Sequence, residues 1–288
     1  SLPEDIQVVL VGDEDQLPSV QPGQVLKDLL ESAVIPTVQL KSIYRQKDGS
    51  SIVQFAHHIK KGELPADFGE ATSDRRFFPC RPDNIGQVVE QICQHALNKG
   101  FTVNDIQVLA PMYKGKAGVE QLNARLQKMF NPESEQRRQI RSRDYTYRVG
   151  DKVLQLVNDM ENQVFNGDIG FVTAIKFAKE TVDKEDQLIV TFEVKEVVYP
   201  WNKLHQLTLA YCCSIHKSQG SEFPIVILPV VRGFYRMLKR NIIYTAVTRS
   251  KRYLLMCGEE EALRMAVENR REDVRHSLLK EKLKEQMG

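Results

Sequence analysis

The sequence contains no apolar run long enough to cross a membrane, and no secretory segment opens it. Cysteine is scarce, and its odd set of five includes no Cys-x-x-Cys spacing, so we expect reduced thiols rather than disulfides or a zinc site. These absences predict a cytoplasmic protein that makes no contact with a membrane. The five residues are Cys80, Cys93, Cys212, Cys213 and Cys257.

Charge of one sign is also lacking, because 40 basic and 38 acidic residues leave a net charge of only +2. A balanced surface excludes a strong overall field that would attract nucleic acid, although Lys and Arg can still cluster in a local groove. Hydrophobic residues make up 42% of the 288 residues and charged residues 27%. This is ordinary for a globular protein that is long enough to form two domains.

The phosphate loop Gly-x-x-x-x-Gly-Lys-Ser/Thr is absent as well. The nearest candidate, Gly115-Lys116-Ala117, lacks the first glycine and the hydroxyl that would hold Mg²⁺. No apolar strand ends in an Asp-Glu pair of the kind that binds the metal. The chain opens with Ser-Leu instead of methionine, so we expect it to be the later portion of a longer protein.

Apolar segments of strand length alternate with amphipathic segments of helix length over most of the chain. This alternation predicts an α/β fold, in which helices cover the faces of a parallel sheet. Ser50-Ser51 and Gly62 are the residue types that start and stop a helix, and Gly100 is expected to end another. We expect strands at residues 6–11, 37–41, near 77, at 106–110 and at 225–231, and helices at 23–32, 52–61, 85–99, 118–130, 259–267 and 271–284.

The pattern changes after about residue 140. Residues 139–143 are polar and basic and are expected to form a linker. Asn166-Gly167 predicts a type I′ hairpin. Short strands joined by turns predict a small β-barrel, inserted because the α/β pattern resumes at residue 208. The strands are expected at residues 153–157, 171–175, 188–192 and 196–199.

Three polar segments lie next to apolar strands. Gly12-Asp-Glu-Asp-Gln-Leu-Pro-Ser19 follows an apolar segment, and Ser214-Ile-His-Lys-Ser-Gln-Gly-Ser-Glu-Phe223 precedes another. The third, Tyr244-Thr-Ala-Val-Thr-Arg249, lies near the end of the chain. Polar groups where strands meet loops are well placed to contact phosphates or ribose.

In this order the segments resemble the third, fifth and sixth motifs of superfamily 1 helicases. The strings Tyr-Arg-Gln, Gln-Leu-Pro-Ser and Ala-Pro-Met-Tyr resemble the RecD-like branch, which includes the exodeoxyribonuclease V alpha subunit and stand-alone bacterial RecD-like helicases. The resemblance extends from about residue 6 to 258. It implies a RecA-like, P-loop NTPase-type parallel sheet domain with an inserted Src-homology-3-like barrel. The expected parts are a remnant of a first RecA-like domain (1–36), a second RecA-like domain (37–143 and 208–258), the barrel (144–207) and C-terminal helices or tail (259–288).

The resemblance also assigns residues to the γ-phosphate of a nucleotide. Gln16 is the expected sensor of the γ-phosphate or the attacking water. Arg45 and Arg249 are the expected arginine fingers, because a guanidinium suits developing negative charge better than an ammonium does. Asp13 and Tyr44 are expected to line the nucleotide site, with Tyr44 near the adenine; a place in the core is the alternative for Tyr44.

The central segment is expected to contact both ligands. Gly220 allows backbone amides close to a phosphate because it has no Cβ. Glu222 is expected to accept from a ribose hydroxyl, and Gln219 to bridge the nucleotide and the domain. Ser214, His216 and Lys217 are expected to face the nucleic-acid backbone, with a structural histidine as the alternative at position 216.

Two further loops are expected to contact DNA. Tyr113 and Lys114 combine an aromatic ring with a cation, which suits single-stranded nucleic acid. Asn166 lies at the tip of a predicted turn in the barrel, which touches the DNA strand in relatives. A turn with no ligand is the alternative for Asn166.

The resemblance implies ATP and Mg²⁺ as cofactors of the intact protein, with the phosphate loop and metal ligands outside this chain. No residue here is assigned to a metal. The implied partners are single-stranded DNA, the missing N-terminal RecA-like domain and subunits of a recombination complex. The implied activity is ATP-driven 5′-to-3′ translocation with duplex unwinding in recombination or repair, and we expect this chain alone not to hydrolyse ATP.

Two other hypotheses stay open from the sequence. One is a non-catalytic module that binds nucleic acid or docks a protein, and the other is an RNA helicase of the same superfamily. A reading frame upstream of Ser1 that encodes a phosphate loop would favour the motor over the module. Unwinding of DNA compared with RNA duplexes would separate the two helicases.

Overall fold

The computed structural model describes residues 6–18, 23–40, 49–142, 145–193, 195–269 and 277–287. Tyr44 and Arg45, which were expected at the nucleotide site, lie outside these residues.

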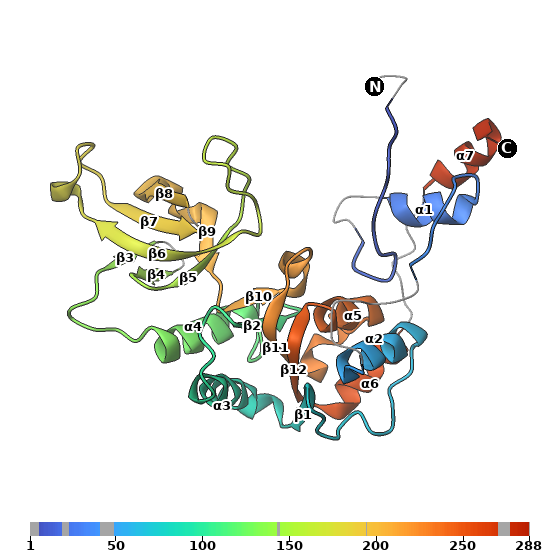
Figure 1. The fold of residues 1–288 in the computed structure, drawn as a ribbon. Coiled ribbons are helices and arrows are strands. Elements are labelled where there is room, and N and C mark those ends of the chain that lie inside the picture. Colours follow the sequence, from blue (N-terminus) through green and yellow to red (C-terminus); the bar gives the residue numbers. More distant parts are fainter. Residues whose placement is uncertain are drawn as a thin grey trace.

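A five-stranded parallel sheet forms the centre of the protein, in the order β1-β12-β11-β2-β10 (Figure 1). β2 is buried along its whole length, as expected for a strand that carries helices on both faces. The predicted parallel α/β core is therefore confirmed. The strands are Arg75–Pro79 (β1), Ile106–Ala110 (β2), Cys212–Ser214 (β10), Phe223–Val230 (β11) and Ser250–Gly258 (β12).

Helices cover both faces of this sheet. α3 (Ile85–Asn98) and α4 (Val119–Phe130) lie on one face; α2 (Ser51–Lys61), α5 (Arg240–Val247) and α6 (Glu260–Glu268) lie on the other (Figure 1). The ends of α2 agree with the prediction, because the Ser50 side chain accepts from the Ile52 amide and Gly62 takes a left-handed φ of 83°.

A second sheet of five antiparallel strands has the order β8-β7-β6-β5-β9. A two-stranded ribbon, β3 (Gln139–Arg141) with β4 (Thr146–Arg148), precedes it. We call residues 139–209 the antiparallel unit. Its strands are Lys152–Gln155 (β5), Ile169–Lys176 (β6), Gln187–Phe192 (β7), Lys195–Pro200 (β8) and Leu207–Leu209 (β9).

Two helices stand apart from the sheets. α1 (Val25–Ser32) packs against α7 (Leu279–Met287), and Lys280 Nζ lies 2.8 Å from a carboxylate oxygen of Glu31 (Figure 1). Short 3₁₀ helices complete the described structure: Pro82–Asn84 (η1), Ala178–Glu180 (η2), Trp201–Gln206 (η3), Ile215–Ser218 (η4) and Arg232–Met237 (η5).

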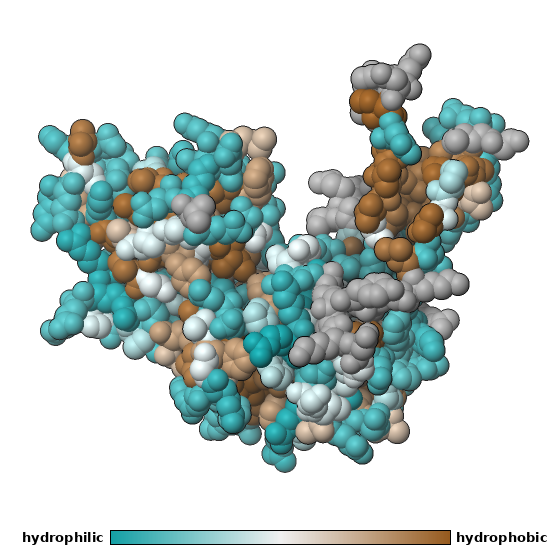
Figure 2. Space-filling model, in the orientation of Figure 1, coloured by the Kyte–Doolittle hydropathy of each residue, from teal (hydrophilic) through white to brown (hydrophobic). Residues whose placement is uncertain are grey.

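The prediction of strands at residues 6–11 and 37–41 is wrong for the residues that the structure describes there. Residues 6–11 and 37–40 form no strand, and their apolar side chains are exposed, Val11 by 90% and Val38 by 88%. A buried parallel strand needs hydrogen-bonded neighbours and covering helices, and none of the described strands pairs with either segment. Figure 2 shows the resulting apolar surface over the N-terminal segment.

The linker expected at residues 139–143 is also wrong, because residues 139–141 pair with β4 and bury Ile140. A turn does form at Asn166-Gly167, where the Asp168 amide donates to the Phe165 carbonyl at 3.0 Å. Of the two central residues, Gly167 alone has a positive φ (105°), so the turn is not type I′. β6 pairs with β5 rather than with residues 164–165, and residues 156–168 form the loop between them, here called the β5–β6 loop.

Buried polar contacts join the antiparallel unit to the rest of the protein. The Asp151 carboxylate accepts from Gln127 Nε2 (2.6 Å), Asn131 Nδ2 (2.7 Å) and the Tyr211 hydroxyl (2.8 Å). The Arg148 amide adds a fourth hydrogen bond at 2.7 Å. This carboxylate therefore connects α4, the start of β5 and the segment that enters β10.

The next residue, Lys152, sends its side chain from β5 toward the parallel sheet. Its Nζ donates to the Val103 carbonyl (3.2 Å) and the Ile106 carbonyl (3.0 Å), and the side chain is only 2% exposed. Burial lowers the pKa of this ammonium to about 8. The antiparallel unit is thus anchored to the rest of the protein through a carboxylate and an ammonium at adjacent positions.

Candidate functional site

The site is built around Arg249, which lies between the end of α5 and the start of β12. Because Phe223 pairs with Ser250 in the sheet, the residues just before β11 lie beside Arg249. Its Nη1 donates to the Ser221 carbonyl at 3.2 Å, and its Nε donates to the Thr245 carbonyl at 3.0 Å. The side chain is buried, with 3% exposure, so its guanidinium is held in one orientation.

The loop at residues 13–18 packs onto the same place. Arg249 Nη2 donates to Gln16 Oε1 at 3.1 Å, across 233 positions of sequence. The Leu17 amide donates to Thr245 Oγ1 at 3.0 Å, and the Leu17 side chain is buried in the core. The predicted sensor Gln16 and the predicted finger Arg249 are therefore in direct contact.

Asp13 accepts hydrogen bonds within this loop and from α5. Its Oδ2 lies 3.0 Å from Gln16 Nε2 and 3.2 Å from the Tyr244 hydroxyl. Burial and the nearby Asp13 charge raise the pKa of Tyr244, so the phenol stays protonated and acts as a donor at neutral pH. Asp15 forms an ion pair with Lys60 of α2, which raises the pKa of that lysine.

The segment after η4 completes the cluster. Gln219 Nε2 donates to the Leu17 carbonyl at 2.7 Å, so segments near residues 16, 219 and 249 meet at one point. Gly220 has a left-handed φ of 83°, a conformation that favours glycine. The carboxylate of Glu222 is 3.3 Å from Lys251 Nζ of β12.

The predicted nucleic-acid residues divide into buried and exposed ones. Ser214 is only 4% exposed, so its burial does not support contact with a nucleic-acid backbone. His216 is half-buried, and burial lowers its pKa, which keeps the imidazole neutral at pH 7. Tyr113 is 47% exposed, and its neighbour Lys114 is exposed after the end of β2.

Lys217 of η4, just after β10, contacts the β5–β6 loop. Its Nζ donates to Asn166 Oδ1 at 2.5 Å, although the two residues lie 51 positions apart. Burial lowers the pKa of Lys217. Two residues that the sequence assigned separately to DNA therefore touch each other.

The sequence interpretation missed Thr245, Ser221 and the Tyr244 hydroxyl as members of the cluster. Thr245 and Tyr244 lie within the string that identified Arg249, but no spacing indicates that they hold the loop at residues 13–18. The junction residues Asp151 and Lys152 were also missed, since neither belongs to a recognisable motif.

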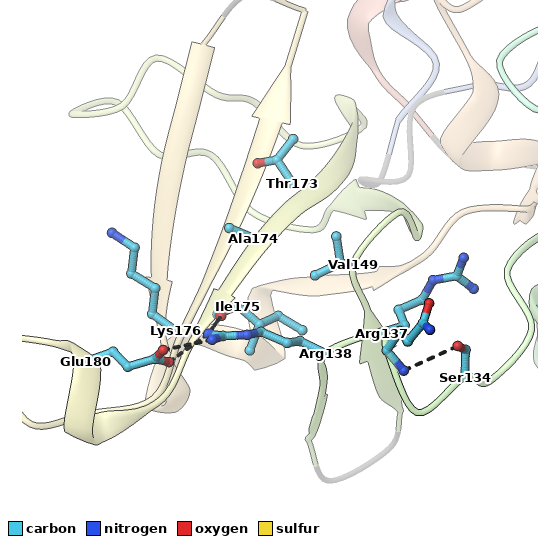
Figure 3. Close-up of a pocket in the computed structure, with 10 residues that line it drawn as sticks. Ser134, Arg137, Arg138, Val149, Thr173, Ala174, Ile175, Lys176 and Glu180 are labelled. Carbon is cyan, nitrogen blue, oxygen red and sulfur yellow. Dashed lines mark hydrogen bonds and ion pairs between the residues drawn. The ribbon is translucent and has the colours of Figure 1, made fainter.

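A separate groove of about 640 Å³ lies on the antiparallel unit, between the segment before β3 and strand β6 (Figure 3). Arg138 lines this groove and donates to both carboxylate oxygens of Glu180, at 2.7 and 2.8 Å. This hydrogen-bonded ion pair lowers the pKa of Glu180 to about 2. The pair neutralises one of the three cations that line the groove, and Arg137 and Lys176 are the other two.

Among the residues that the structure describes, no three His, Cys, Asp or Glu side chains are grouped closely enough to hold a metal ion. No helix among them is long and apolar enough to span a membrane.

Three family models match successive parts of the chain. The family described as an ATP-dependent RecD-like DNA helicase SH3 domain matches residues 122–192. The family described as a UvrD-like helicase C-terminal domain matches residues 209–257, and an AAA domain family matches residues 2–77. The expected combination of a helicase-type parallel sheet and an SH3-like unit is thereby confirmed, while the boundaries given above for the four parts stay predictions.

Two curated relatives match almost the whole chain. It is 34% identical over 286 residues to an ATP-dependent RecD2 DNA helicase of Deinococcus radiodurans, covering 99% of this chain and 37% of that protein. It is 30% identical over 292 residues to the RecBCD enzyme subunit RecD of Mycolicibacterium smegmatis, covering 96% of this chain and 49% of that protein. The chain thus spans half or less of the length of these relatives.

One solved structure has a similar fold. A Bacteroides Pif1 helicase bound to single-stranded DNA superposes with a TM-score of 0.53 and 18% identity, covering 88% of this chain and 62% of that chain.

Proposed function

The chain belongs to the RecD-like branch of the superfamily 1 helicases, and on that premise we propose that it is part of an ATP-dependent DNA helicase. In this proposal the chain completes the nucleotide-binding site and binds the DNA strand. The activity of the whole protein is ATP-driven 5′-to-3′ movement along single-stranded DNA, with duplex unwinding in recombination or repair. The observation that carries the proposal is the meeting of Gln16, Gln219 and Arg249 at one point of the fold.

Arg249 is the arginine finger in this proposal. Its Nη2 donates to the Gln16 amide oxygen at 3.1 Å, and a γ-phosphate oxygen in that position would accept from the same donor. The hydrogen bonds from Nε and Nη1 to the Thr245 and Ser221 carbonyls keep the guanidinium oriented. An oriented guanidinium stabilises the negative charge that develops during phosphoryl transfer.

The neighbouring residues sense and position the nucleotide. Gln16 exchanges its bond to Arg249 for the γ-phosphate or the attacking water, and Gln219 transmits this change through its contact with the Leu17 carbonyl. Gly220 provides backbone amides for phosphate, and Glu222 accepts from the ribose. Asp13 holds Gln16 in place, and Tyr44 and Arg45 keep their assigned roles as an adenine contact and a second finger.

ATP and Mg²⁺ are the proposed cofactors. The bound nucleotide supplies the phosphoryl group that is transferred to water. The metal ligands and the phosphate loop are proposed to come from a first RecA-like domain outside this chain.

The exposed apolar segment near the N-terminus is proposed to pack in that first domain. Val9 and Val11 are exposed by 74% and 90%, although both belong to a segment with the composition of a buried strand. Recombination-complex subunits are proposed as further partners. A cytoplasmic location is proposed because all five cysteines are free thiols, four of them buried.

The test uses this 288-residue chain and a longer form that also carries the phosphate loop. We expect no DNA-stimulated ATP hydrolysis by the chain alone and clear stimulation by single-stranded DNA in the longer form. In the longer form, R249A should lower kcat by about 10³-fold or more. R249K should not restore kcat, because an ammonium cannot reproduce the hydrogen bonds that the guanidinium donates from Nε, Nη1 and Nη2.

Arg252→Ala is the matched control, because this exposed arginine lies three residues further along, on β12, and stacks over Phe101 and Tyr253. Its kcat should stay within about twofold of the unmodified protein. DNA-stimulated hydrolysis by the 288-residue chain alone, or an R249A enzyme of unchanged kcat, would contradict the proposal. RNA-specific stimulation would favour the RNA helicase.

A further inference from the structure

The β5–β6 loop exposes three apolar side chains. Val157 is 43% exposed, Met160 is 74% exposed and Phe165 is 45% exposed. The loop stands out from the antiparallel unit on the side that faces the rest of the chain (Figure 1). Three exposed apolar side chains on one short loop indicate a binding surface more strongly than isolated ones do.

The loop is held in this shape by its own hydrogen bonds. Asp159 and Val164 exchange two backbone hydrogen bonds, at 2.7 and 3.0 Å. The Phe165 amide donates to Asp168 Oδ2 at 2.7 Å, and the Asn166 amide donates to Asn158 Oδ1 at 2.9 Å. The backbone on both sides of Phe165 is therefore fixed, and the ring is presented to solvent in a defined position.

Cations lie at two points of this loop. Lys217 Nζ donates to Asn166 Oδ1 at 2.5 Å, and Asn166 is the residue that follows Phe165. Lys195 Nζ donates to Gln163 Oε1 at 3.1 Å. Each ammonium is held by a neutral amide oxygen. The loop also carries three carboxylates: those of Asp159 and Asp168 accept from backbone amides of the loop itself, and Glu161 is exposed. Exposed apolar groups flanked by cations match a ligand that has both flat apolar faces and negative charges.

A second pairing of ring and cation lies on the neighbouring strand. β2 pairs with β10 in the sheet, and the chain beyond β2 carries the exposed Tyr113 and Lys114. The chain beyond β10 carries Lys217, which reaches the β5–β6 loop. One ring and its cation therefore follow β2, and the cation that follows β10 contacts the loop that carries the other ring.

We propose that Phe165 is a base-stacking residue for single-stranded nucleic acid. Its ring receives the face of an unpaired base, while Lys217 contacts the adjoining phosphate in place of Asn166. This inference rests on the proposed function, since it names the bases as the part of the nucleic-acid strand that Phe165 of the antiparallel unit contacts. It differs from the sequence assignment of Asn166, which concerned the turn and not the ring.

The experiment compares two labelled probes by fluorescence anisotropy with the 288-residue chain. One is an oligothymidine of about 12 nucleotides, and the other has the same phosphates with abasic sites in place of the bases. Phe165→Ala should weaken binding of the oligothymidine by about fivefold or more and leave binding of the abasic probe within about twofold. Phe165→Leu, which keeps apolar volume but has no aromatic face, should behave like Phe165→Ala.

Val182→Ala is the control, because Val182 is a 97% exposed apolar residue elsewhere on the antiparallel unit. It should leave the binding of both probes unchanged. Lys217→Met should weaken both probes, because the lysine is assigned to phosphate. The Phe165 ring is solvent-exposed, so the variants should keep the circular dichroism spectrum and melting temperature of the unmodified chain.

Other outcomes overturn the inference. Oligothymidine binding by Phe165→Ala equal to that of the unmodified chain would remove the stacking role and leave the proposed function intact. Equal weakening of both probes would show that Phe165 acts on the backbone contacts or the loop structure, which also contradicts stacking. An unmodified chain that binds neither probe would count against strand binding by this chain, and the inference would fail with it.

Discussion

Replacing Lys152 by methionine should change how the stability of this protein depends on pH. Lys152 is only 2% exposed, and its Nζ is bonded to two backbone carbonyls rather than to a carboxylate. Asp105, Cys93 and Cys213 are the titratable groups whose charges act on it. Methionine fills a similar volume without the charge, so the comparison isolates the ammonium.

The sign follows from the direction of the pKa change. Burial lowers the pKa of Lys152 from 10.5 to about 8, so the folded protein releases this proton at a lower pH than the unfolded chain does. Between these two values the unfolded state binds more protons, and the free energy of unfolding rises with pH. The cost of the buried charge is therefore fully present below pH 8 and is relieved as the pH approaches 10.5.

The magnitude is large enough to measure. A pKa displacement is worth about 1.4 kcal/mol per pH unit, which makes the full cost about 3 kcal/mol. Between pH 7 and pH 10 the difference in unfolding free energy, unmodified minus K152M, should rise by about 2.5 kcal/mol. The thiols of Cys93 and Cys213 have pKa values of about 12, above this window, so their titration in the folded state does not interfere.

The assay is urea unfolding of both proteins, followed by circular dichroism at pH 7, 8, 9 and 10. Comparing two proteins at each pH cancels the titration of the other groups in the unfolded chains. Lys176→Met is the control, because Lys176 is exposed on β6 of the same unit, and its difference from the unmodified protein should not vary with pH. A difference for K152M that is equally flat would refute the assignment of a buried, charged ammonium at this position.

Substitutions at one buried carboxylate and at two glycines test the packing of the fold. Asp151→Ala should lower the free energy of unfolding by about 3 to 5 kcal/mol, because four buried donors lose their acceptor. Asp183→Ala, at an exposed carboxylate, should change the free energy of unfolding little. Comparable urea midpoints for the two variants would contradict this prediction. Gly258→Ala should cost at least about 2 kcal/mol, because φ is 128° and an added Cβ would lie 2.0 Å from the Val230 carbonyl oxygen. Gly220→Ala, with φ of 83° but open space around the Cβ, should cost about 1 kcal/mol, and a thermal melt that ranks the two glycines in the opposite order would count against this account.

Much of the fold could be predicted from local sequence. The strand at residues 106–110 was expected and found at the same residues, because a short, mostly apolar run between Asp105 and Pro111 has few other conformations. The helix that ends at Gly62 was likewise expected, since the Ser50 side chain and the left-handed glycine act on backbone groups only a few residues away. Such interactions depend on neighbours in sequence and are readable without the fold.

The candidate site could be predicted only in part. The strings around Gln16, Gln219 and Arg249 were identified by their resemblance to helicase motifs, and the structure brings all three together. The contact of Thr245 with the Leu17 amide could not be foreseen, because it joins positions 228 residues apart. Ser214 was assigned with its neighbours but lies inside the protein, since all three residues of β10 are buried.

Residue order by itself determined the alternation of strands and helices, the ends of α2 and the three polar segments that carry the resemblance to helicases. Tertiary structure alone decided that the apolar residues 6–11 form no strand, that Lys152 is buried and that Lys217 meets Asn166. The physical reason is the range of the forces concerned. Capping and periodicity act within a few residues, whereas strand pairing, desolvation of an ammonium and contacts between loops depend on which distant segments share the same space.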